Sequence, residues 1–267
     1  MPVLEGLTLT DTLPACRAAR RWKARDAHGA PFTACRVQTP PDVDHATLRD
    51  RLAPLVNLAG PHLLRIERLL TDERGRIWAI SPYTGNHDGL VTLASLLPQK
   101  DGGQMSPDEA ERAIGHVLEA LAWLHEHNLH HGPLRADELL VDRHGSVLVE
   151  LPGVLRFAQG LNRGDAELVR DEIHSLGLIA YQLITGLEPG TPRIPAARLV
   201  KRLPRAWDTW IETALDESAG FFTVAEAAAA LPSSGNATTT AGVSTPDAPQ
   251  VRTLAGNWLR RFPGVSR

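Results

Sequence analysis

The sequence predicts an α+β fold made of two parts, a small antiparallel β-sheet that carries one helix and a larger, mainly α-helical part. Short apolar or alternating segments, separated by turn signals, occupy residues 5–85. Longer segments with helical apolar periodicity occupy residues 86–231. Because the two kinds of pattern meet near Ser81 to Gly89, we expect two lobes with a cleft between them.

In the first part, the segments Phe32 to Val37 and Arg76 to Ile80 are typical of strands. Asp26 to Pro31 and Asp72 to Gly75 hold the Asp and Gly residues that favour turns between strands. One amphipathic stretch, Asp44 to Leu58, interrupts the strand pattern and predicts a single helix.

The second part opens with a strong helix start, in which Ser106 caps the helix, Pro107 takes the first helical position and Glu109 completes a capping box. Its apolar periodicity continues to Asn128, a residue that tolerates the left-handed conformation of a helix end. Two short strand-like segments follow, and then three further helices. These elements are predicted at Glu138 to Val141, Ser146 to Leu151, Glu167 to Thr185, Ala206 to Leu215 and Val224 to Leu231.

The composition changes near the carboxyl end of the sequence. Residues 232–250 are mostly Ser, Thr, Pro, Gly and Ala, which bury too little apolar surface to offset their ordering entropy, and we expect a flexible linker there. Residues 251–267 place Leu254, Trp258 and Phe262 at helical spacing beside arginines. This segment predicts an amphipathic tail helix that docks either on this chain or on a partner.

Composition excludes several classes of protein. The chain has 267 residues, 43% of them apolar and 22% charged, which is the balance of a soluble globular protein. A net charge of −3 argues against a nucleic-acid partner. No apolar segment reaches the roughly 18 residues of a membrane span, and the first residues lack the pattern of a secretory signal. We therefore expect a cytoplasmic protein with no membrane partner, whose two cysteines, Cys16 and Cys35, are inert thiols.

Five segments, in the right order, resemble the Ser/Thr protein kinases of the bacterial Hanks type. Residues 121–142 (LAWLHEHNLHHGPLRADELLVD) are similar to the family's catalytic-loop pattern LxYLHxxGIxHRDLKPxNILLD. Residues 172–177 (EIHSLG) and 181–186 (YQLITG) are similar to DIYSLG and YELLTG. Upstream, residues 23–37 resemble the pair of strands that carries the family's lysine, and residues 60–65 (GPHLLR) resemble HPHIVR. The resemblance implies a bilobal protein-kinase-like fold.

The catalytic groups of that family are replaced in this sequence. Pro133 stands at the position of the catalytic Asp, Arg135 at that of the loop Lys, and Glu138 at that of the metal-binding Asn. The magnesium-binding triplet DFG reads LPG, so that Leu151 replaces its Asp and Gly153 retains its Gly. No catalytic residue and no metal site are expected from this pattern.

The nucleotide-binding positions are altered as well. The loop at residues 13–21 has no glycine, and Arg21 stands where the family has an apolar Val. Arg36 falls on the lysine position, and Ala34 on the position beside adenine. The partner Glu aligns near Arg51, with Asp50 next to it. If a nucleotide were bound, Ala34, Arg36, Glu138 and Gly153 would line its cleft.

The activation segment is also short. Only 19 positions separate Gly153 from Glu172, with no APE motif, which is too few for the usual peptide-docking platform. The resemblance therefore implies a pseudokinase that serves as a binding or scaffolding module in signalling. Its partner would be a protein, for example an active kinase or a signalling protein, and no cofactor is expected. The alternative is an atypical ATP- and magnesium-dependent phosphotransferase, or a nucleotide-binding protein, with a rewired site.

Three other groups of residues allow a second interpretation. The histidines at 125, 127, 130 and 131 are interpreted as structural rather than as metal ligands, because the spacing His-Glu-x-x-His is absent. Glu138 and Glu150 are interpreted as a solvated pair at strand ends, and alternatively as an acidic pair for a cation. The basic residues between 17 and 25 are interpreted as solvated surface, and alternatively as a surface for an acidic partner.

Overall fold

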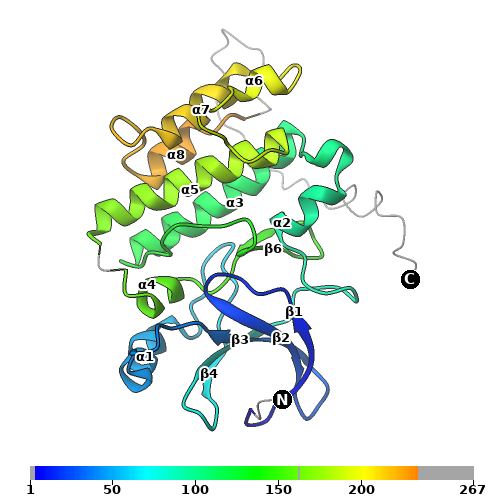
Figure 1. Ribbon diagram of the computed structural model, residues 1–267, viewed down its shortest axis with the longest axis vertical. Helices are drawn as coiled ribbons and strands as arrows, with labels where there is room; N and C mark the ends of the chain where they lie inside the picture. The colour runs from blue at the N-terminus through cyan, green and yellow to red at the C-terminus, as the bar shows by residue number, and fades with distance from the viewer. Residues whose placement is uncertain (1–3, 162, 234–267) are drawn as a thin grey trace, which may run out of the picture.

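The computed structural model describes residues 4–161 and 163–233, which form a β-sheet part and a helical part (Figure 1). We call residues 4–82 the N-lobe and residues 90–233 the C-lobe. The predicted linker from residue 234 onward and the predicted tail helix 251–267 lie outside the described residues.

The N-lobe contains a five-stranded antiparallel sheet with the strand order β1-β2-β3-β5-β4. Turns form at Asp26 and Asp72, as predicted, because each carboxylate accepts backbone N–H groups of its own turn. The strands are β1 (Thr8–Leu13), β2 (Ala19–Arg25), β3 (Pro31–Val37), β4 (Arg68–Thr71) and β5 (Ile77–Pro82).

One helix, α1 (His45–Leu52), accompanies the sheet, as predicted, and Asp44 caps its first turn. It is shorter than the predicted stretch to Leu58 because Pro54 has no N–H to continue the hydrogen-bond ladder, and a single turn of 3₁₀-helix follows.

The two faces of the sheet bury different clusters. Ala34 and Trp78 pack with leucines of the N-terminal segment on one face. Cys35 packs with Leu48 and Leu52 of α1 on the other, because successive side chains of a strand point to opposite faces. This second cluster also contains C-lobe residues of α4 (Val154–Ala158), so it joins the two lobes.

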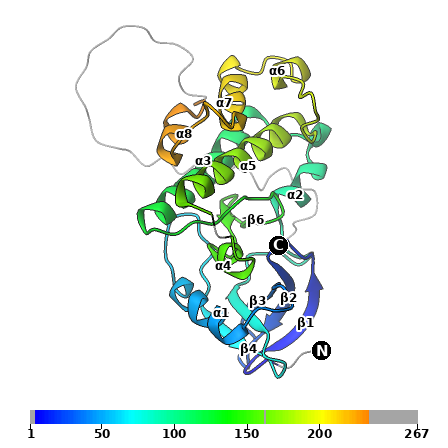
Figure 2. The same cartoon turned by 60° about the vertical axis from the view of Figure 1, so that its left-hand side comes forward.

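The C-lobe core forms around two long helices, α3 (Pro107–Glu126) and α5 (Asp165–Thr185), which run side by side in all views (Figures 1 and 2). Ser106 caps α3 through the predicted capping box, and Asn128 after its end has φ 56°. The long helix α5 ends at Gly186, whose φ of 72° is readily adopted only by glycine. The remaining helices are α2 (Leu93–Leu96), α6 (Ala196–Leu199), α7 (Arg205–Leu215) and α8 (Val224–Ala230).

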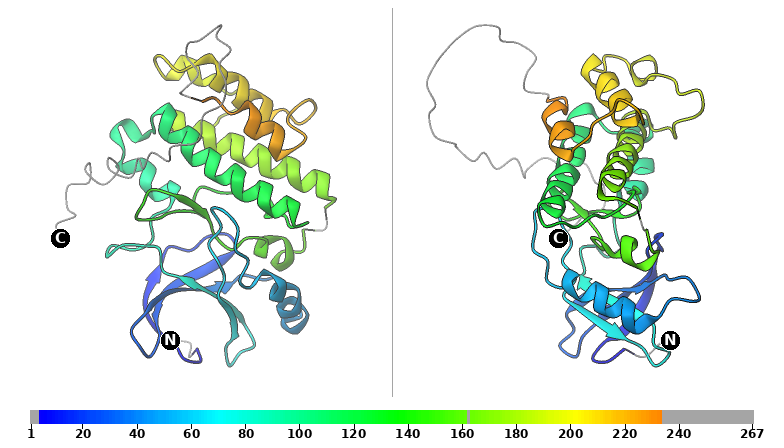
Figure 3. Two further views of the ribbon diagram at one scale, coloured as in Figure 1. Left: turned by 180° about the vertical axis from the view of Figure 1, so that it is seen from behind. Right: turned by 90° about the vertical axis from the view of Figure 1, so that its left-hand side faces the viewer.

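A short hairpin connects the lobes. It consists of β6 (Leu139–Val141) and β7 (Val147–Val149), and it lies between the N-lobe sheet and helices α3 and α5 (Figure 3). The Leu64 N–H donates to the Val149 carbonyl oxygen at 2.9 Å, which fixes the hairpin to the N-lobe. The residues at the open end of this hairpin therefore face the cleft between the lobes.

Among the described residues, none of the helices has both the length and the apolar character that a membrane crossing requires.

Candidate functional site

A buried ion pair forms between the lobes, and it joins Arg21 of β2 to Glu150, which follows β7. Arg21 Nε donates to Glu150 Oε2 at 2.8 Å, and Arg21 Nη2 contacts the same oxygen. Arg21 Nη2 also donates to the Asp137 carbonyl oxygen at 2.8 Å. Arg21 and Glu150 are only 1% and 2% exposed. The guanidinium thus ties the sheet of the N-lobe to two segments of the C-lobe.

A second ion pair lies beside the first. Arg17, in the loop between β1 and β2, places its Nη2 3.0 Å from Glu138 Oε2 and also donates to the Pro133 carbonyl oxygen. The Glu138 side chain is 3% exposed and the Arg17 side chain 29%. The loop that would cover a nucleotide is therefore bound to the segment that would carry the catalytic groups.

The hairpin explains why both carboxylates reach the cleft. Leu139 pairs with Val149, so Glu138 and Glu150 stand opposite one another at the open end, where the Glu150 N–H donates to the Glu138 carbonyl oxygen at 3.1 Å. The prediction of a solvated pair is wrong: both carboxylates are buried because an arginine from the N-lobe covers each of them.

Burial and charge shift the titration of this cluster. Burial raises the pKa of Glu150, and the adjacent Arg21 guanidinium opposes that rise. Burial alone would lower the pKa of Arg21, but the Glu150 carboxylate raises it above the ordinary value. The guanidinium does not deprotonate, and its two contacts with Glu150 favour the ionised carboxylate.

The two thiols lie next to this pair. Cys35 Sγ is 3.6 Å from Glu150 Oε1, and burial raises the pKa of Cys35. Burial, followed by the Glu150 charge, raises the pKa of Cys16 to about 11. Both thiols are therefore protonated at neutral pH, in agreement with the prediction of inert cysteines.

The structure corrects the predicted register of β3. Arg36 stands over the Trp22 and Trp78 rings, and Ala34 is buried in the same cluster as Trp78, so both point away from the cleft. Cys35 is the β3 side chain that meets Glu150. A shift of one residue moves every side chain of a strand to the opposite face, and for this reason neither Ala34 nor Arg36 lines the cleft.

Leu151 and Gly153 lie at the junction of the lobes. Leu151 is buried in the cluster that contains Leu52 and Leu55 of the N-lobe, so an apolar side chain fills the position of the magnesium ligand. Gly153 has φ 74°, and a Cβ there would lie 3.2 Å from Leu55 Cδ2. The positive φ favours glycine at this position, and a side chain there would also press on Leu55 of the N-lobe.

Helix α1 supplies no acidic partner to the cleft. Asp50 and Arg51 are both exposed, and the side chains that α1 directs at the sheet are Leu48 and Leu52. At the position where the kinase pattern has a lysine–glutamate pair, the Cys35 thiol therefore packs against Leu48 and Leu52.

The loop between α3 and β6 is held in place by side chains of α5. Glu172 of α5 accepts the His131 and Gly132 N–H groups at 2.6 and 2.8 Å. Ser175 Oγ accepts the Leu134 N–H at 2.8 Å. Pro133 offers only its carbonyl oxygen, and Arg135 has a 60% exposed side chain that pairs with Asp137.

The basic residues between 17 and 25 do not form one surface. Arg17 and Arg21 turn inward to Glu138 and Glu150, which contradicts their interpretation as solvated side chains. Arg20 and Arg25 are exposed, and Lys23 stands 4.8 Å from the centroid of the Tyr83 ring.

Sequence reasoning missed Cys35 and Glu172 as residues of this region. Cys35 pairs with Arg21 of β2, so the two side chains share one face of the sheet. Because side chains alternate between the faces of a strand, this pairing would have identified Cys35 as a residue of the site. Glu172 lies in the EIHSLG segment, at the position where the family pattern has Asp. Nothing in that segment predicts that its carboxylate accepts two backbone N–H groups of the loop.

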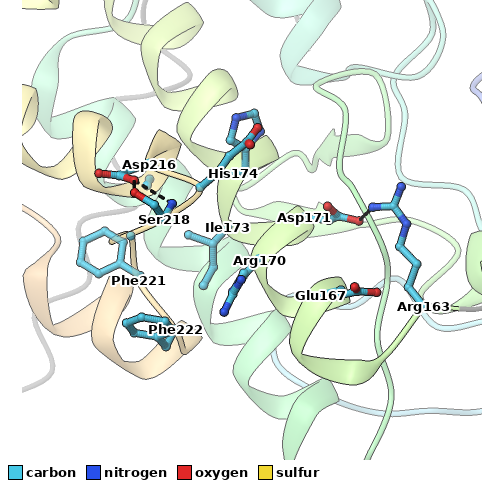
Figure 4. A pocket seen from close by; sticks show the side chains of 13 residues that line it. Arg163, Glu167, Arg170, Asp171, Ile173, His174, Asp216, Ser218, Phe221 and Phe222 are labelled. Carbon is cyan, nitrogen blue, oxygen red and sulfur yellow. Dashed lines mark hydrogen bonds and ion pairs between the residues drawn. The ribbon is translucent and has the colours of Figure 1, made fainter.

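A separate pocket lies beside α5, away from the cleft (Figure 4). Arg163 pairs with Asp171 across it, and the Arg170 guanidinium stands 5.6 Å from the Phe222 ring centroid. Asp216 accepts hydrogen bonds from the Ser218 hydroxyl and backbone. Each of these charged groups is engaged by a near neighbour rather than directed at one point in the pocket, so the pocket carries no evident chemistry.

Comparison of the sequence with known proteins gives distant relatives. No family model matches the sequence. The probable serine/threonine-protein kinase PknB of Bifidobacterium longum is 22% identical over 63% of this chain. The CBL-interacting protein kinase 25 of Oryza sativa subsp. japonica is 22% identical over 53% of it. The matched segments span only 30% and 31% of the lengths of these two relatives.

Comparison of the structure gives a consistent fold. A double-mutant form of the Mycobacterium tuberculosis PknI kinase domain matches with a TM-score of 0.70 and 16% identity, over 86% of this chain and 96% of that one. The PknI kinase domain without these substitutions matches with a TM-score of 0.67 and 15% identity, over 86% of this chain and 96% of that one. The described residues therefore have the bilobal protein-kinase-like fold.

Proposed function

We propose that this protein-kinase-like domain is catalytically inactive and serves as a protein-binding or scaffolding module in cytoplasmic signalling. One observation carries the proposal: the cleft holds two ion pairs, Arg17–Glu138 and Arg21–Glu150, whose carboxylates are buried. In a fold that otherwise positions ATP, these side chains take the space and the charges that a nucleotide and its metal would need.

The chemistry of phosphoryl transfer supports this proposal. That reaction depends on metal ions that neutralise phosphate charge and on a residue that orients the attacking hydroxyl. Pro133 can neither accept a proton nor orient a hydroxyl, and Leu151 cannot bind a metal. Glu138 has one oxygen engaged by Arg17 at 3.0 Å. We therefore expect neither ATP nor magnesium as a cofactor.

Nucleotide entry would also disturb the ion pairs. A phosphate group could reach Arg21 only by displacing Glu150, which would leave a buried carboxylate without its partner. Breaking a buried pair in this way costs about 3–5 kcal/mol. This penalty opposes binding before any contact with the nucleotide is counted.

The test is radiolabel transfer by the purified full-length chain, with γ-labelled ATP, magnesium or manganese, and a general acceptor protein. The proposal predicts incorporation no higher than in a reaction without the chain. Incorporation that rises with chain concentration and is lost in Glu138→Gln would contradict it. Arg135→Gln, which changes an exposed side chain of the same loop, is the matched control.

One observation favours the alternative, a rewired nucleotide-dependent transferase. Glu138 Oε1 is buried and has no hydrogen-bond partner among the described residues, so it offers one free acceptor to a cation. Arg36 and Arg135 do not join Glu138, because Arg36 lies on the far face of the sheet and Arg135 is exposed. Activity lost specifically in Glu138→Gln would identify this alternative.

For the partner, we propose an acidic protein segment that binds the outer face of the N-lobe. Arg20 pairs with Arg36 across β2 and β3, and burial, followed by the charges of Arg76 and Arg20, lowers the pKa of Arg36. Arg74 is exposed beside them. Arg76 is paired with Asp72, so Arg20, Arg36 and Arg74 supply the positive charge of this face, on a chain whose net charge is −3.

Binding of a labelled polyglutamate peptide tests this surface. We expect salt-sensitive binding that is lost in the Arg20→Glu, Arg74→Glu double variant and retained in Arg205→Glu, an exposed position of the C-lobe. Equal binding by both variants would rule out the outer face of the N-lobe as the docking surface.

A further inference from the structure

A cluster of potential metal ligands lies in the C-lobe behind the loop between α3 and β6. It consists of His125 in the last turn of α3, His130 in the loop and Glu172 of α5, with one ligand atom of each residue within 4.8 Å of the others. His125 Nε2 is 2.6 Å from Glu172 Oε2, and the His125 and His130 ring centroids are 4.8 Å apart.

His130 is the unusual member of this cluster. Its residue is 6% exposed, yet its Nδ1 has no hydrogen-bond partner among the described residues. Its Nε2 has only a 3.4 Å contact with Oδ1 of Asp165, whose side chain is 72% exposed. Buried polar atoms without partners are rare, and each needs an explanation such as a bound ion or water.

We propose that His125, His130 and Glu172 bind a divalent transition-metal ion, for which Zn²⁺ fits the ligands best. Two imidazoles and one carboxylate form a common zinc ligand set, which leaves a fourth position for water. Magnesium and calcium prefer sites made entirely of oxygen ligands and do not match this set.

The arrangement requires only a small adjustment to hold the ion. Zinc–ligand bonds are about 2.0–2.2 Å long, so the hydrogen bond between His125 and Glu172 must open as the metal replaces its proton. The His125 side chain is 18% exposed, which gives the ion a path and the ring room to turn.

A metal here would have a structural consequence for the loop. Glu172 Oε1 already accepts the His131 and Gly132 N–H groups, and Oε2 faces His125. An ion bound to Oε2 would hold the end of α3, the loop and α5 as one unit. The site is independent of nucleotide binding, since its members lie outside the ion pairs of the cleft.

Zinc titration of the full-length chain, first treated with a chelator, tests the proposal. We expect ZnCl₂ alone to raise the melting temperature, and Co²⁺ to give the visible absorption bands of a tetrahedral site. Removal of one ligand in His130→Phe should weaken zinc binding by about tenfold or more. This variant replaces an imidazole that makes no hydrogen bond through Nδ1, so its metal-free melting temperature should stay close to that of the wild type.

His127→Gln is the matched control, because His127 is an exposed neighbour whose Nδ1 contacts the Trp123 carbonyl oxygen. It should bind zinc as the wild type does. His125→Gln supplies a second ligand variant in case His130→Phe fails to fold, and it too should bind weakly. The proposal is overturned if the wild type shows neither a zinc-dependent shift nor cobalt bands, or if both ligand variants keep the wild-type affinity.

Discussion

Arg21 and Glu150 define the cleft at the scale of single residues. A guanidinium and a carboxylate that are almost fully buried lose their hydration. The loss is offset by the hydrogen bonds that they make to each other, by those of Arg21 to the Pro14 and Asp137 carbonyl oxygens, and by the contact of Cys35 with Glu150. The paired charges are tolerated in the folded protein, but either charge left buried without the other would destabilise the fold. This asymmetry gives the first prediction.

Replacing Arg21 by Met should destabilise the fold by about 3–5 kcal/mol, because Glu150 would remain buried without a partner. The double variant Arg21→Met, Glu150→Met should recover most of that loss, since it removes both charges and keeps similar volumes. Urea unfolding of the single and double variants measures the coupling. Arg20→Met, at the exposed neighbouring position, should change stability by less than about 0.5 kcal/mol. Additive effects of the two cleft substitutions would show that the pair is not formed.

His116 makes stability dependent on pH. Its Nδ1 accepts the Val147 N–H at 3.1 Å, its ring stacks on His62, and burial, followed by the charges of His62 and Arg112, lowers its pKa from 6.5 to about 4. The unfolded chain therefore binds a proton at a higher pH than the folded chain. Neutral His116 makes its full contribution to the free energy of unfolding above pH 6.5. That contribution decreases as the pH falls from 6.5 to about 4.

Denaturant midpoints between pH 7.5 and pH 4.5 check this prediction. His116→Asn keeps an acceptor for the Val147 N–H but does not titrate, so it should show a shallower fall than the wild type. A fall of equal steepness in both proteins would assign the pH dependence to other groups.

At the scale of elements, the start of α3 is the clearest example of local control. Ser106 Oγ accepts the Glu109 N–H at 3.3 Å, and Glu109 Oε2 accepts the Ser106 N–H at 2.9 Å. Ser106→Ala should lower the free energy of unfolding by about 1 kcal/mol, and Ser106→Gly by only a few tenths. Chemical denaturation of the two variants tests this order, and equal losses would contradict a capping role.

Elements with strong local signals were predictable from the sequence. Ser106 and Asn128 delimit α3, and Gly186 ends α5, because each terminus depends on a residue with a specific conformational preference. The short helices α2, α4 and α6 were not predicted, because four or five residues carry no periodicity of their own. Their formation depends on tertiary packing, as for Val154 and Leu155 of α4 in the cluster between the lobes.

The residues of the cleft were less predictable than the elements. Motif spacing predicted that Pro133, Glu138 and Leu151 lie near one another, and in the structure all three lie where the two lobes meet. The partners of Glu138 and Glu150 come from more than 100 residues away in the sequence, and no local pattern indicates such contacts. The motif alone predicts that Ala34 and Arg36 share the face of β3 that meets the C-lobe. The pairing of β3 with β2 shows that this face carries Cys35, one position away from each of them.

At the scale of the whole molecule, the lobes are joined by charge and by apolar packing. The two ion pairs occupy the cleft, and Leu151 and helix α4 pack against Leu52 and Leu55 of the N-lobe. A bilobal fold that binds nucleotide needs an accessible cleft between its lobes. Here, the same position is a buried interface between the lobes.

Thermal melting with and without ATP and Mg²⁺ tests this account most directly. A ligand present at about 100 times its dissociation constant stabilises a fold by about 2.7 kcal/mol, which gives an easily measured shift. We predict that millimolar ATP with magnesium leaves the melting temperature of the wild type unchanged. A magnesium-dependent increase, reduced in Glu138→Gln but not in Arg135→Gln, would show that the cleft binds nucleotide and would contradict the account.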